Sequence, residues 1–301
     1  MRFAAGLLAL LPFLGACAGT IEARALDGTP FERIAPSGER LEHYRAELTA
    51  ARERWRSTAS EDDAVWVGRH LGYLGRYREA IDWYGARLED FPRSAKLLRH
   101  RGHRLLSVRE FERAAADLER AWGLVAGLPD EVEPDGAPNA LGIPRSTLKT
   151  NVLYHLALAR WLQGDFARAE AVWRECNALS PNDDAVVSAL NWHVHALRRL
   201  GREREARAAL APVLPEMDVV ENHAYHRILL LQKGLLEAGD VLDASGEDGV
   251  QDATAAYGVS LWHLANGERA AAEELWRRMV KETPWNAFGH IGAEAELARS
   301  R

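Results

Sequence analysis

The run Glu221–His226, which reads Glu-Asn-His-Ala-Tyr-His, is the densest group of side chains that could do chemistry. His223 and His226 stand three residues apart, so on a helix both imidazoles project from nearly one face and could share a metal ion. A third ligand would have to come from a neighbouring helix, for example His155 or His195, and no His-Glu-x-x-His pattern is present. We favour the alternative, in which residues at the start of the run cap a helix and the histidines hydrogen-bond to neighbouring helices.

No nucleophile accompanies this run. The chain has neither a Gly-x-Ser-x-Gly pattern nor a glycine-rich phosphate loop. Cys176 is expected on the second helix of a pair, as a small packing residue rather than as an activated thiol. We therefore expect no cofactor, and a binding protein is favoured over an enzyme.

The N-terminus predicts export. Arg2 precedes an apolar run over residues 3–13 that is too short for the roughly 20 residues of a transmembrane helix. Leu14, Gly15, Ala16 and Cys17 follow, and these four resemble the lipobox of bacterial lipoproteins. The resemblance implies that residues 1–16 are a signal peptide and that Cys17 is acylated. The alternative is an ordinary signal peptide in which Cys17 falls after the cut by chance.

The expected location is the bacterial cell envelope. Ala18 rather than an aspartate follows the cysteine, which favours the outer membrane, facing the periplasm. Cys17 and Cys176 are the only cysteines, so a lipidated Cys17 leaves Cys176 without a disulfide partner. The chain has 38 basic and 44 acidic residues, a formal net charge of −6, which argues against nucleic acid and against contact with anionic lipid beyond the anchor.

The organisation of the chain comes from an internal repeat. Residues 61–94 can be laid over residues 95–128 without a gap at a shift of 34. This period is typical of stacked helical hairpins. The matched positions are Gly68 with Gly102, Leu71 with Leu105, Tyr77 with Phe111, Ala80 with Ala114, and Tyr84 with Leu118.

The first copy resembles a tetratricopeptide repeat. The residues that carry the resemblance are Gly68, Gly75, Tyr77, Ala80, Tyr84 and Pro92. It implies an all-α fold, a right-handed α-solenoid of helical hairpins in which the first helix of each hairpin lines the concave side. It leaves the ligand open, because surface residues set the partner of such a scaffold.

The resemblance and the helical periodicity divide the chain into segments. We expect an acylated cysteine and flexible tether over 17–38, a capping helix over 39–58, and a repeat array over 59–301. Within residues 128–146 the prolines and acids exclude a helix, and this insertion is either functional or flexible. The expected repeat units are 61–94, 95–127, 148–183, 184–218, an irregular unit over 221–250 with one helix over 221–238, and 252–284, followed by a capping helix over 286–299.

The predicted binding surface is rich in amphipathic rings on the first helices. Such rings suit peptide or small polar ligands, although aromatic residues at helical spacing also serve helix packing. The candidates are Trp66, Arg69, His70, Tyr154, His155, Trp192, His195, Glu221, Asn222, His223, Tyr225 and His226.

Two functions remain open. The first is a lipid-anchored scaffold that binds a protein or peptide partner on its concave face. The second is a small-ligand or metal-binding protein, and conceivably an enzyme, with a site between units three and five. Convergence of the candidates on one closed pocket would favour the second function, and their spread along an open groove would favour the first. The sequence leaves the oligomeric state open.

Overall fold

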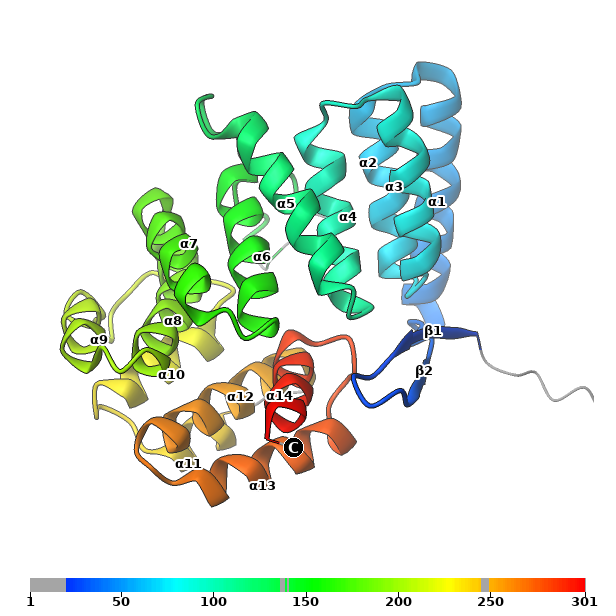
Figure 1. Ribbon diagram of the computed structural model, residues 1–301. Helices are drawn as coiled ribbons and strands as arrows, with labels where there is room; N and C mark the ends of the chain where they lie inside the picture. Colours follow the sequence, from blue (N-terminus) through cyan, green and yellow to red (C-terminus); the bar gives the residue numbers. More distant parts are fainter. Residues whose placement is uncertain (1–19, 136–138, 140, 245–248, 301) are drawn as a thin grey trace, which may run out of the picture.

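The computed structural model describes residues 20–135, 139, 141–244 and 249–300 (Figure 1). The lipobox, including Cys17, lies outside the described residues. In the part described, helices dominate, and a single two-stranded hairpin precedes them. The elements are β1 (Ile21–Arg24), β2 (Pro30–Glu32), α1 (Gly38–Thr58), α2 (Glu61–Tyr73), α3 (Tyr77–Asp90), α4 (Ala95–Ser107), α5 (Phe111–Val125), α6 (Leu148–Leu162), α7 (Phe166–Leu179), α8 (Asp183–Arg199), α9 (Glu203–Ala209), α10 (His223–Gln232), α11 (Ala238–Asp243), α12 (Gly249–Ala265), α13 (Arg269–Glu282) and α14 (Phe288–Arg299).

Glycines of the repeat allow its helices to pack closely. A Cβ atom added to Gly68 of α2 would lie 2.2 Å from the Tyr84 ring of α3. One repeat later, a Cβ atom on Gly102 of α4 would lie 2.7 Å from Leu118 of α5. Both contacts join residues sixteen apart, so the 34-residue match of the sequence corresponds to a repeated helix-to-helix contact. The fold is an all-α solenoid of helical hairpins, as the sequence predicts.

The fourth and fifth units have short second helices. Their second helices, α9 and α11, have only seven and six residues. The helix expected over 221–238 was predicted too long, because α10 ends at Gln232. Gly234 there adopts a positive φ of 74°, and the amide of Leu235 donates back to the Leu230 carbonyl, which closes the helix end.

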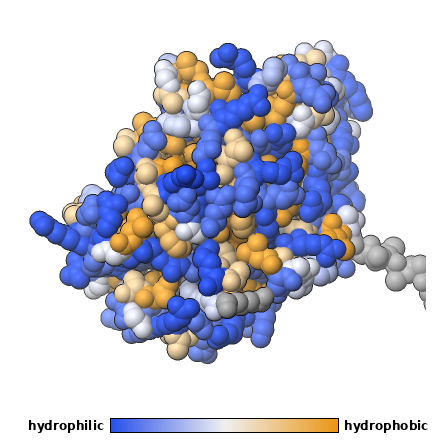
Figure 2. Space-filling view, viewed as in Figure 1, coloured by the Kyte–Doolittle hydropathy of each residue, from blue (hydrophilic) through white to orange (hydrophobic). Residues whose placement is uncertain are grey.

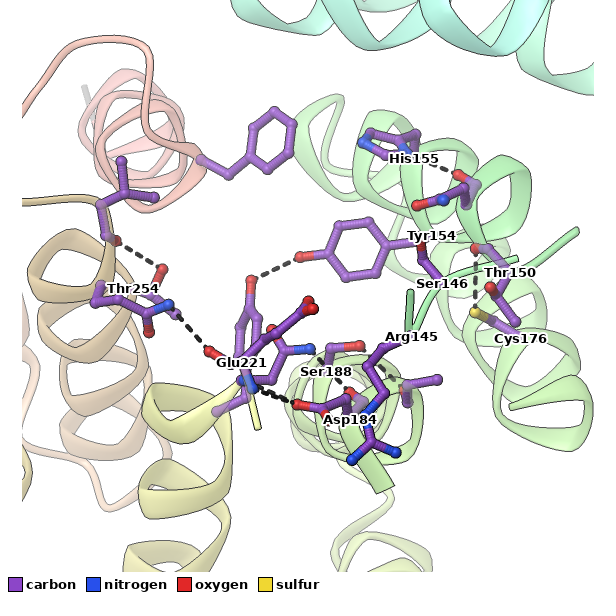
Figure 3. Close-up of a pocket in the computed structure, with 17 residues that line it drawn as sticks. Arg145, Ser146, Thr150, Tyr154, His155, Cys176, Asp184, Ser188, Glu221 and Thr254 are labelled. Atoms are coloured by element: carbon purple, nitrogen blue, oxygen red, sulfur yellow. Dashed lines mark hydrogen bonds and ion pairs between the residues drawn. The ribbon is translucent and has the colours of Figure 1, made fainter. Parts of the chain in front are cut away.

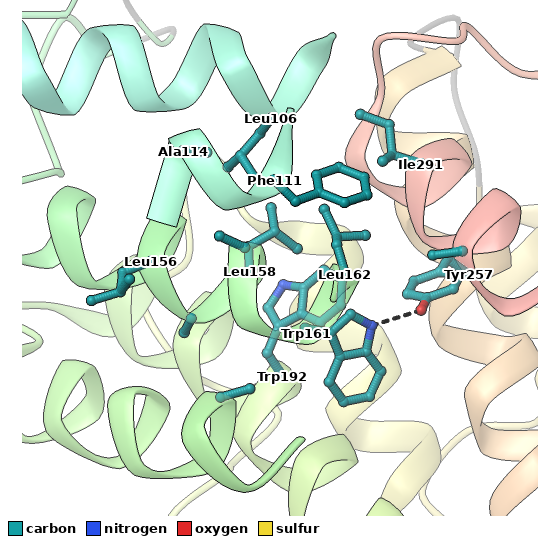
Figure 4. Close-up of a cluster of buried hydrophobic side chains, with 14 of the residues drawn as sticks. Leu106, Phe111, Ala114, Leu156, Leu158, Trp161, Leu162, Trp192, Tyr257 and Ile291 are labelled. Carbon is teal, nitrogen blue, oxygen red and sulfur yellow. Dashed lines mark hydrogen bonds between the residues drawn. The ribbon is translucent and has the colours of Figure 1, made fainter. Parts of the chain in front are cut away.

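The C-terminal end of the array folds back onto its middle, so that α14 contacts α6 and α12 contacts α8. In this buried core the Trp161 indole donates a 2.8 Å hydrogen bond to the Tyr257 hydroxyl (Figure 4). Arg199 of α8 pairs with Glu296 of α14. The array is therefore more closed than the simple curved ribbon that the repeats suggest.

The flexible tether predicted for 17–38 is wrong for its described part. Residues 21–32 form an antiparallel hairpin whose turn places Gly28 at φ 92°, with the Asp27 carboxylate accepting from the amide of Thr29. The ring of Phe31 stacks on Trp285, with centroids 5.4 Å apart. The apolar face of this hairpin holds it against the C-terminal part of the array.

Arg109 joins the hairpin, the second unit and the C-terminus. It lies 34 residues after Gly75 and shares the left-handed backbone of that glycine, with φ 67° against 70°. Its buried guanidinium donates to the Glu294 carboxylate at 3.1 Å and to the Trp285 carbonyl at 2.8 Å. It also lies 5.0 Å above the Phe31 ring. One side chain thus holds together parts of the chain that are far apart in sequence.

Among the described residues, none of the helices combines the length and apolar character that crossing a bilayer requires. On the face seen in Figure 2, hydrophilic and hydrophobic residues are interspersed.

Candidate functional site

A cavity of about 340 Å³ lies where the third, fourth and fifth units meet the C-terminal helices. Its wall comes from α6, α8, α12, α14 and the start of α10, together with the end of the insertion (Figure 3). Five of the residues predicted from the sequence converge on it, and they are Tyr154, His155, Glu221, Asn222 and Tyr225.

A chain of hydrogen bonds fixes the two tyrosines. The Trp192 indole donates to the Tyr154 hydroxyl at 3.1 Å, and this hydroxyl lies 2.6 Å from that of Tyr225. The Tyr225 hydroxyl in turn interacts with Thr254 on α12. Burial raises the pKa of both phenols, so they stay protonated and act as neutral hydrogen-bonding groups. Trp192 therefore supports the wall from behind rather than lining the cavity.

His155 is held as a neutral imidazole. Its Nδ1 atom lies 2.6 Å from the Asn151 carbonyl, which can only accept, so Nδ1 carries the proton. Burial, reinforced by the charge of Arg99, lowers the pKa of His155 well below its ordinary value. This histidine offers the cavity an aromatic surface and no charge.

The cavity also contains Cys176, whose thiol is inert. The sulfur contacts the Thr150 carbonyl at 3.7 Å, and burial raises the pKa of the thiol to about 12. Because the thiolate is the reactive form of cysteine, this group is not a nucleophile at neutral pH.

Asp184 organises the floor of the site and is not among the residues predicted from the sequence. Its buried carboxylate accepts from the backbone amides of Val220, Glu221 and Asn222, at 3.1, 2.8 and 2.9 Å. Arg145 of the insertion lies 3.4 Å from the same carboxylate. An aspartate in the first turn of a helix is ordinarily a dipole partner, so the sequence carried no signal that it would bind another loop.

The remaining histidines of the prediction do not share a site. His223 is exposed, whereas the Nε2 atom of His226 lies 2.8 Å from the Leu214 carbonyl. His195 is buried and contacts the Gln232 amide at 3.2 Å. Within the described ranges, no three or more His, Cys, Asp or Glu residues are grouped so that they could hold a metal ion.

Trp66, Arg69 and His70 belong to a different region. They lie on α2, outside the cavity, where the Trp66 and His70 rings stack with centroids 5.5 Å apart. The Arg69 guanidinium lies 4.3 Å from the Trp66 ring and donates to the Pro134 carbonyl at 2.7 Å. Burial lowers the pKa of His70 to about 4. The predicted surface is therefore divided, and part of it faces the insertion.

The chemistry that the cavity offers is recognition. Its groups are hydroxyls, amides, neutral rings and a few charges, and most of those described are held by neighbouring groups. Arg145 pairs with Asp218 at 2.9 Å as well as with Asp184, and Glu221 accepts from Asn139. Such an arrangement gives a shaped, polar and largely pre-formed site.

Comparison with known proteins gives the fold. No model of a known protein family matches the chain, and no curated protein sequence does either. Among solved structures, a tetratricopeptide repeat protein from Parabacteroides merdae is similar over 85% of this chain and 93% of its own, with 13% identity and a TM-score of 0.51. YrrB, described as a TPR protein with an unusual peptide-binding site, is similar over 84% of this chain and 100% of its own, with 14% identity and a TM-score of 0.45. The arrangement of helices in this chain is thus the tetratricopeptide-repeat fold.

Proposed function

We propose that the chain is an interaction scaffold of the bacterial cell envelope that binds a protein or peptide partner through the cavity beside α6, α8 and α10. The observation that carries this proposal is the tetratricopeptide-repeat fold of the chain. Tyr154, His155 and Glu221, with two further predicted residues, line the cavity where we place the contact. In this reading a polar side chain or a chain end of the partner enters the cavity. Repeat arrays bind partners in this way because their inner helices present a rigid surface.

Binding is favoured over catalysis by the state of the cavity groups. The Cys176 thiol is protonated, the His155 imidazole is neutral and bonded to a carbonyl, and the Asp184 carboxylate is occupied by backbone amides. None of these three has a paired base or acid that would activate it.

A second candidate is a protein that binds a small polar ligand. The observation in its favour is the localised cavity, whose volume lies within the range of roughly 300–1,000 Å³ that is usual for small-molecule sites. Convergence on one cavity, rather than spread along an open groove, is what this candidate predicts.

The variant Ser188→Trp tests both candidates. Ser188 lines the cavity from α8, and among the described residues its hydroxyl is shown bonded only to the Ala185 carbonyl of the same helix. An indole at this position should fill the cavity with little other change. His223→Ala, at an exposed position outside the cavity, is the matched control.

Two readouts separate the candidates. Under the scaffold proposal, a partner crosslinked in the native host is retained by wild type and the control and lost by Ser188→Trp. Under the alternative, native mass spectrometry finds a small molecule on wild type and the control and none on Ser188→Trp. A partner retained by the filled variant would refute the cavity as the binding site.

The lipid anchor is proposed separately, on the resemblance of Leu14–Cys17 to a lipobox. The full-length chain expressed in a bacterial host should carry a diacylglyceryl group on Cys17 and sediment with the outer membrane. The variant Cys17→Ser should lack the diacylglyceryl group and become extractable without detergent. A mature chain with an unmodified Cys17 would contradict this part of the proposal.

A further inference from the structure

An acidic segment of the chain itself, Asp130–Asp135, lies against α2 and α4. On α2 it contacts Arg69, one of the residues predicted to bind a partner. Glu133 is buried there, with 8% of its surface exposed. Its carboxylate pairs with the buried guanidinium of Arg99 on α4 at 2.8 Å and accepts from the Asn151 amide of α6. Arg99 of α4 and Asn151 of α6 thus hold one carboxylate from the insertion.

The charges of the segment and of the helices are complementary. Lys96 of α4 lies 3.4 Å from the Glu131 carboxylate. Arg69 of α2 donates to the Pro134 carbonyl at 2.7 Å, and its charge acts on the carboxylate of Asp135. The bases on α2 and α4 therefore face an extended stretch in which acids alternate with Val132 and Pro134.

One part of the segment belongs to the fold. The Asp130 carboxylate accepts from the amide of Lys149, and the Glu131 carbonyl accepts from the amide of Leu148, so both hold the first turn of α6. Beyond Val132, which forms a single bridge with Thr147, the contacts of residues 133–135 with α2 and α4 are made by side chains and one carbonyl. The Glu133 amide also donates to the Ser146 carbonyl at 3.0 Å. Once this bond and the contact with Asn151 break, residues 133–135 can leave the surface without unfolding a helix.

The fit of residues 133–135 is incomplete. The Arg99 Nε atom and the Asp135 Oδ2 atom are buried and have no hydrogen-bond partner among the described residues. Each unsatisfied buried polar atom costs about 1–3 kcal/mol. A segment that supplied the acceptor missing at Arg99 Nε, and that left no acceptor of its own unpaired, would bind this surface better than the chain's own residues do.

We propose that the surface formed by Arg69 and Arg99 binds an extended acidic peptide segment of a partner, and that residues 133–135 occupy it within the same chain. The internal segment competes with the partner. Its tether gives the internal segment an effective concentration of about 1 mM. For a segment with a Kd of about 10 µM, this competition weakens the binding of the partner by roughly 100-fold. Arg69 and Arg99 do not line the cavity, but Asn151, which donates to Glu133, does, so the two regions adjoin. The inference does not depend on what the cavity binds.

The test uses the full chain and a synthetic peptide with the sequence of residues 130–135, Asp-Glu-Val-Glu-Pro-Asp. Its neutral counterpart, Asn-Gln-Val-Gln-Pro-Asn, is the control ligand. The double variant Glu133→Gln, Asp135→Asn weakens the internal competitor and should bind the acidic peptide roughly 100-fold more tightly than wild type. Adding Arg99→Gln to this variant should remove the binding. Equal binding of both peptides, or no binding by a double variant with unchanged circular dichroism, would overturn the proposal.

Hydrogen exchange on the wild-type chain tests the same idea without a substitution. At millimolar acidic peptide, the amide of Glu133, which donates to the Ser146 carbonyl at 3.0 Å, should exchange faster, because the peptide displaces its segment. Unchanged exchange at saturating peptide would overturn the proposal even if the double variant failed to fold.

Discussion

Replacing Arg109 by glycine tests how the two ends of the array are held together. The substitution removes the buried partner of Glu294 and the hydrogen bond to the Trp285 carbonyl. Breaking a buried ion pair by removing one partner costs about 3–5 kcal/mol. Glycine recovers about 1 kcal/mol, because the backbone here is left-handed, with φ 67°. The expected net loss is about 2–4 kcal/mol in the free energy of unfolding.

The pH dependence of this loss identifies its cause. Burial acts to raise the pKa of Glu294, but hydrogen bonds from His290 and Arg109 outweigh it, and the pKa lies below its ordinary value. A lowered pKa in the folded state gives stability at neutral pH that is lost as pH falls. Without Arg109, protonation of the buried Glu294 carboxyl removes an unpaired charge and so stabilises the folded state of the variant. The difference between wild type and Arg109→Gly should therefore shrink between pH 7 and pH 4.

The assay is urea unfolding followed by far-ultraviolet circular dichroism at both pH values. Arg113→Ala, which removes an exposed partner of Glu110, is the control and should change stability by less than about 0.5 kcal/mol. Arg109→Ala keeps the strained backbone and should be about 1 kcal/mol less stable than Arg109→Gly. A loss below 1 kcal/mol that is the same at both pH values would refute the reasoning.

Three further predictions concern packing, reactivity and protonation. Gly68→Ala should lower the free energy of unfolding by about 1–3 kcal/mol, because the new Cβ atom would lie 2.2 Å from the Tyr84 ring. Gly123→Ala, whose Cβ atom has no neighbour within 4 Å, should stabilise α5 by about 0.5–1 kcal/mol. Equal melting temperatures of the two variants would contradict this prediction. The Cys176 thiol, whose pKa burial raises to about 12, should react with iodoacetamide at pH 7.5 only after unfolding, and rapid labelling of the native chain would be the contrary result. Burial lowers the pKa of His195 to about 3 in the folded chain. As pH falls below 6.5, this histidine therefore binds a proton in the unfolded chain but not in the folded one. The free energy of unfolding should fall by about 1.4 kcal/mol per pH unit between about pH 6.5 and pH 3. His195→Gln should flatten that slope, and an unchanged slope would argue against a neutral, buried His195.

The repeat could be predicted from the sequence because its contacts are local. Gly68 and Tyr84 are sixteen residues apart, and the same pair recurs one repeat later as Gly102 and Leu118. Close packing of two consecutive helices demands a small residue opposite a large one, and this demand leaves a periodic trace in the sequence.

The closure of the array left no such trace. Arg109 and Glu294 are 185 residues apart. The local sign at this position, an arginine where the first repeat has Gly75, does not identify the partner. The N-terminal hairpin is not evident from the sequence, because turn residues such as Gly28 are typical of linkers as well as of hairpins. Its stability comes from Trp285, which is distant in the sequence.

The candidate site was predicted in part for the same reason. Tyr154 and Tyr225 could be chosen as rings on first helices, but their mutual hydrogen bond depends on how two units pack. Asp184 was missed because its ligands are backbone amides of another loop, which side-chain patterns do not reveal. The pairing of His223 with His226 followed helical spacing correctly, yet only His226 is buried.

The central claim is that the cavity receives the partner, and site-specific photocrosslinking tests it most directly. A benzophenone amino acid would be placed at Val250, which lines the cavity and is 47% exposed, and separately at His223, outside the cavity, in the full-length chain in its native host. A discrete adduct is expected from position 250 and none from position 223. An adduct from position 223 with none from position 250 would contradict the claim.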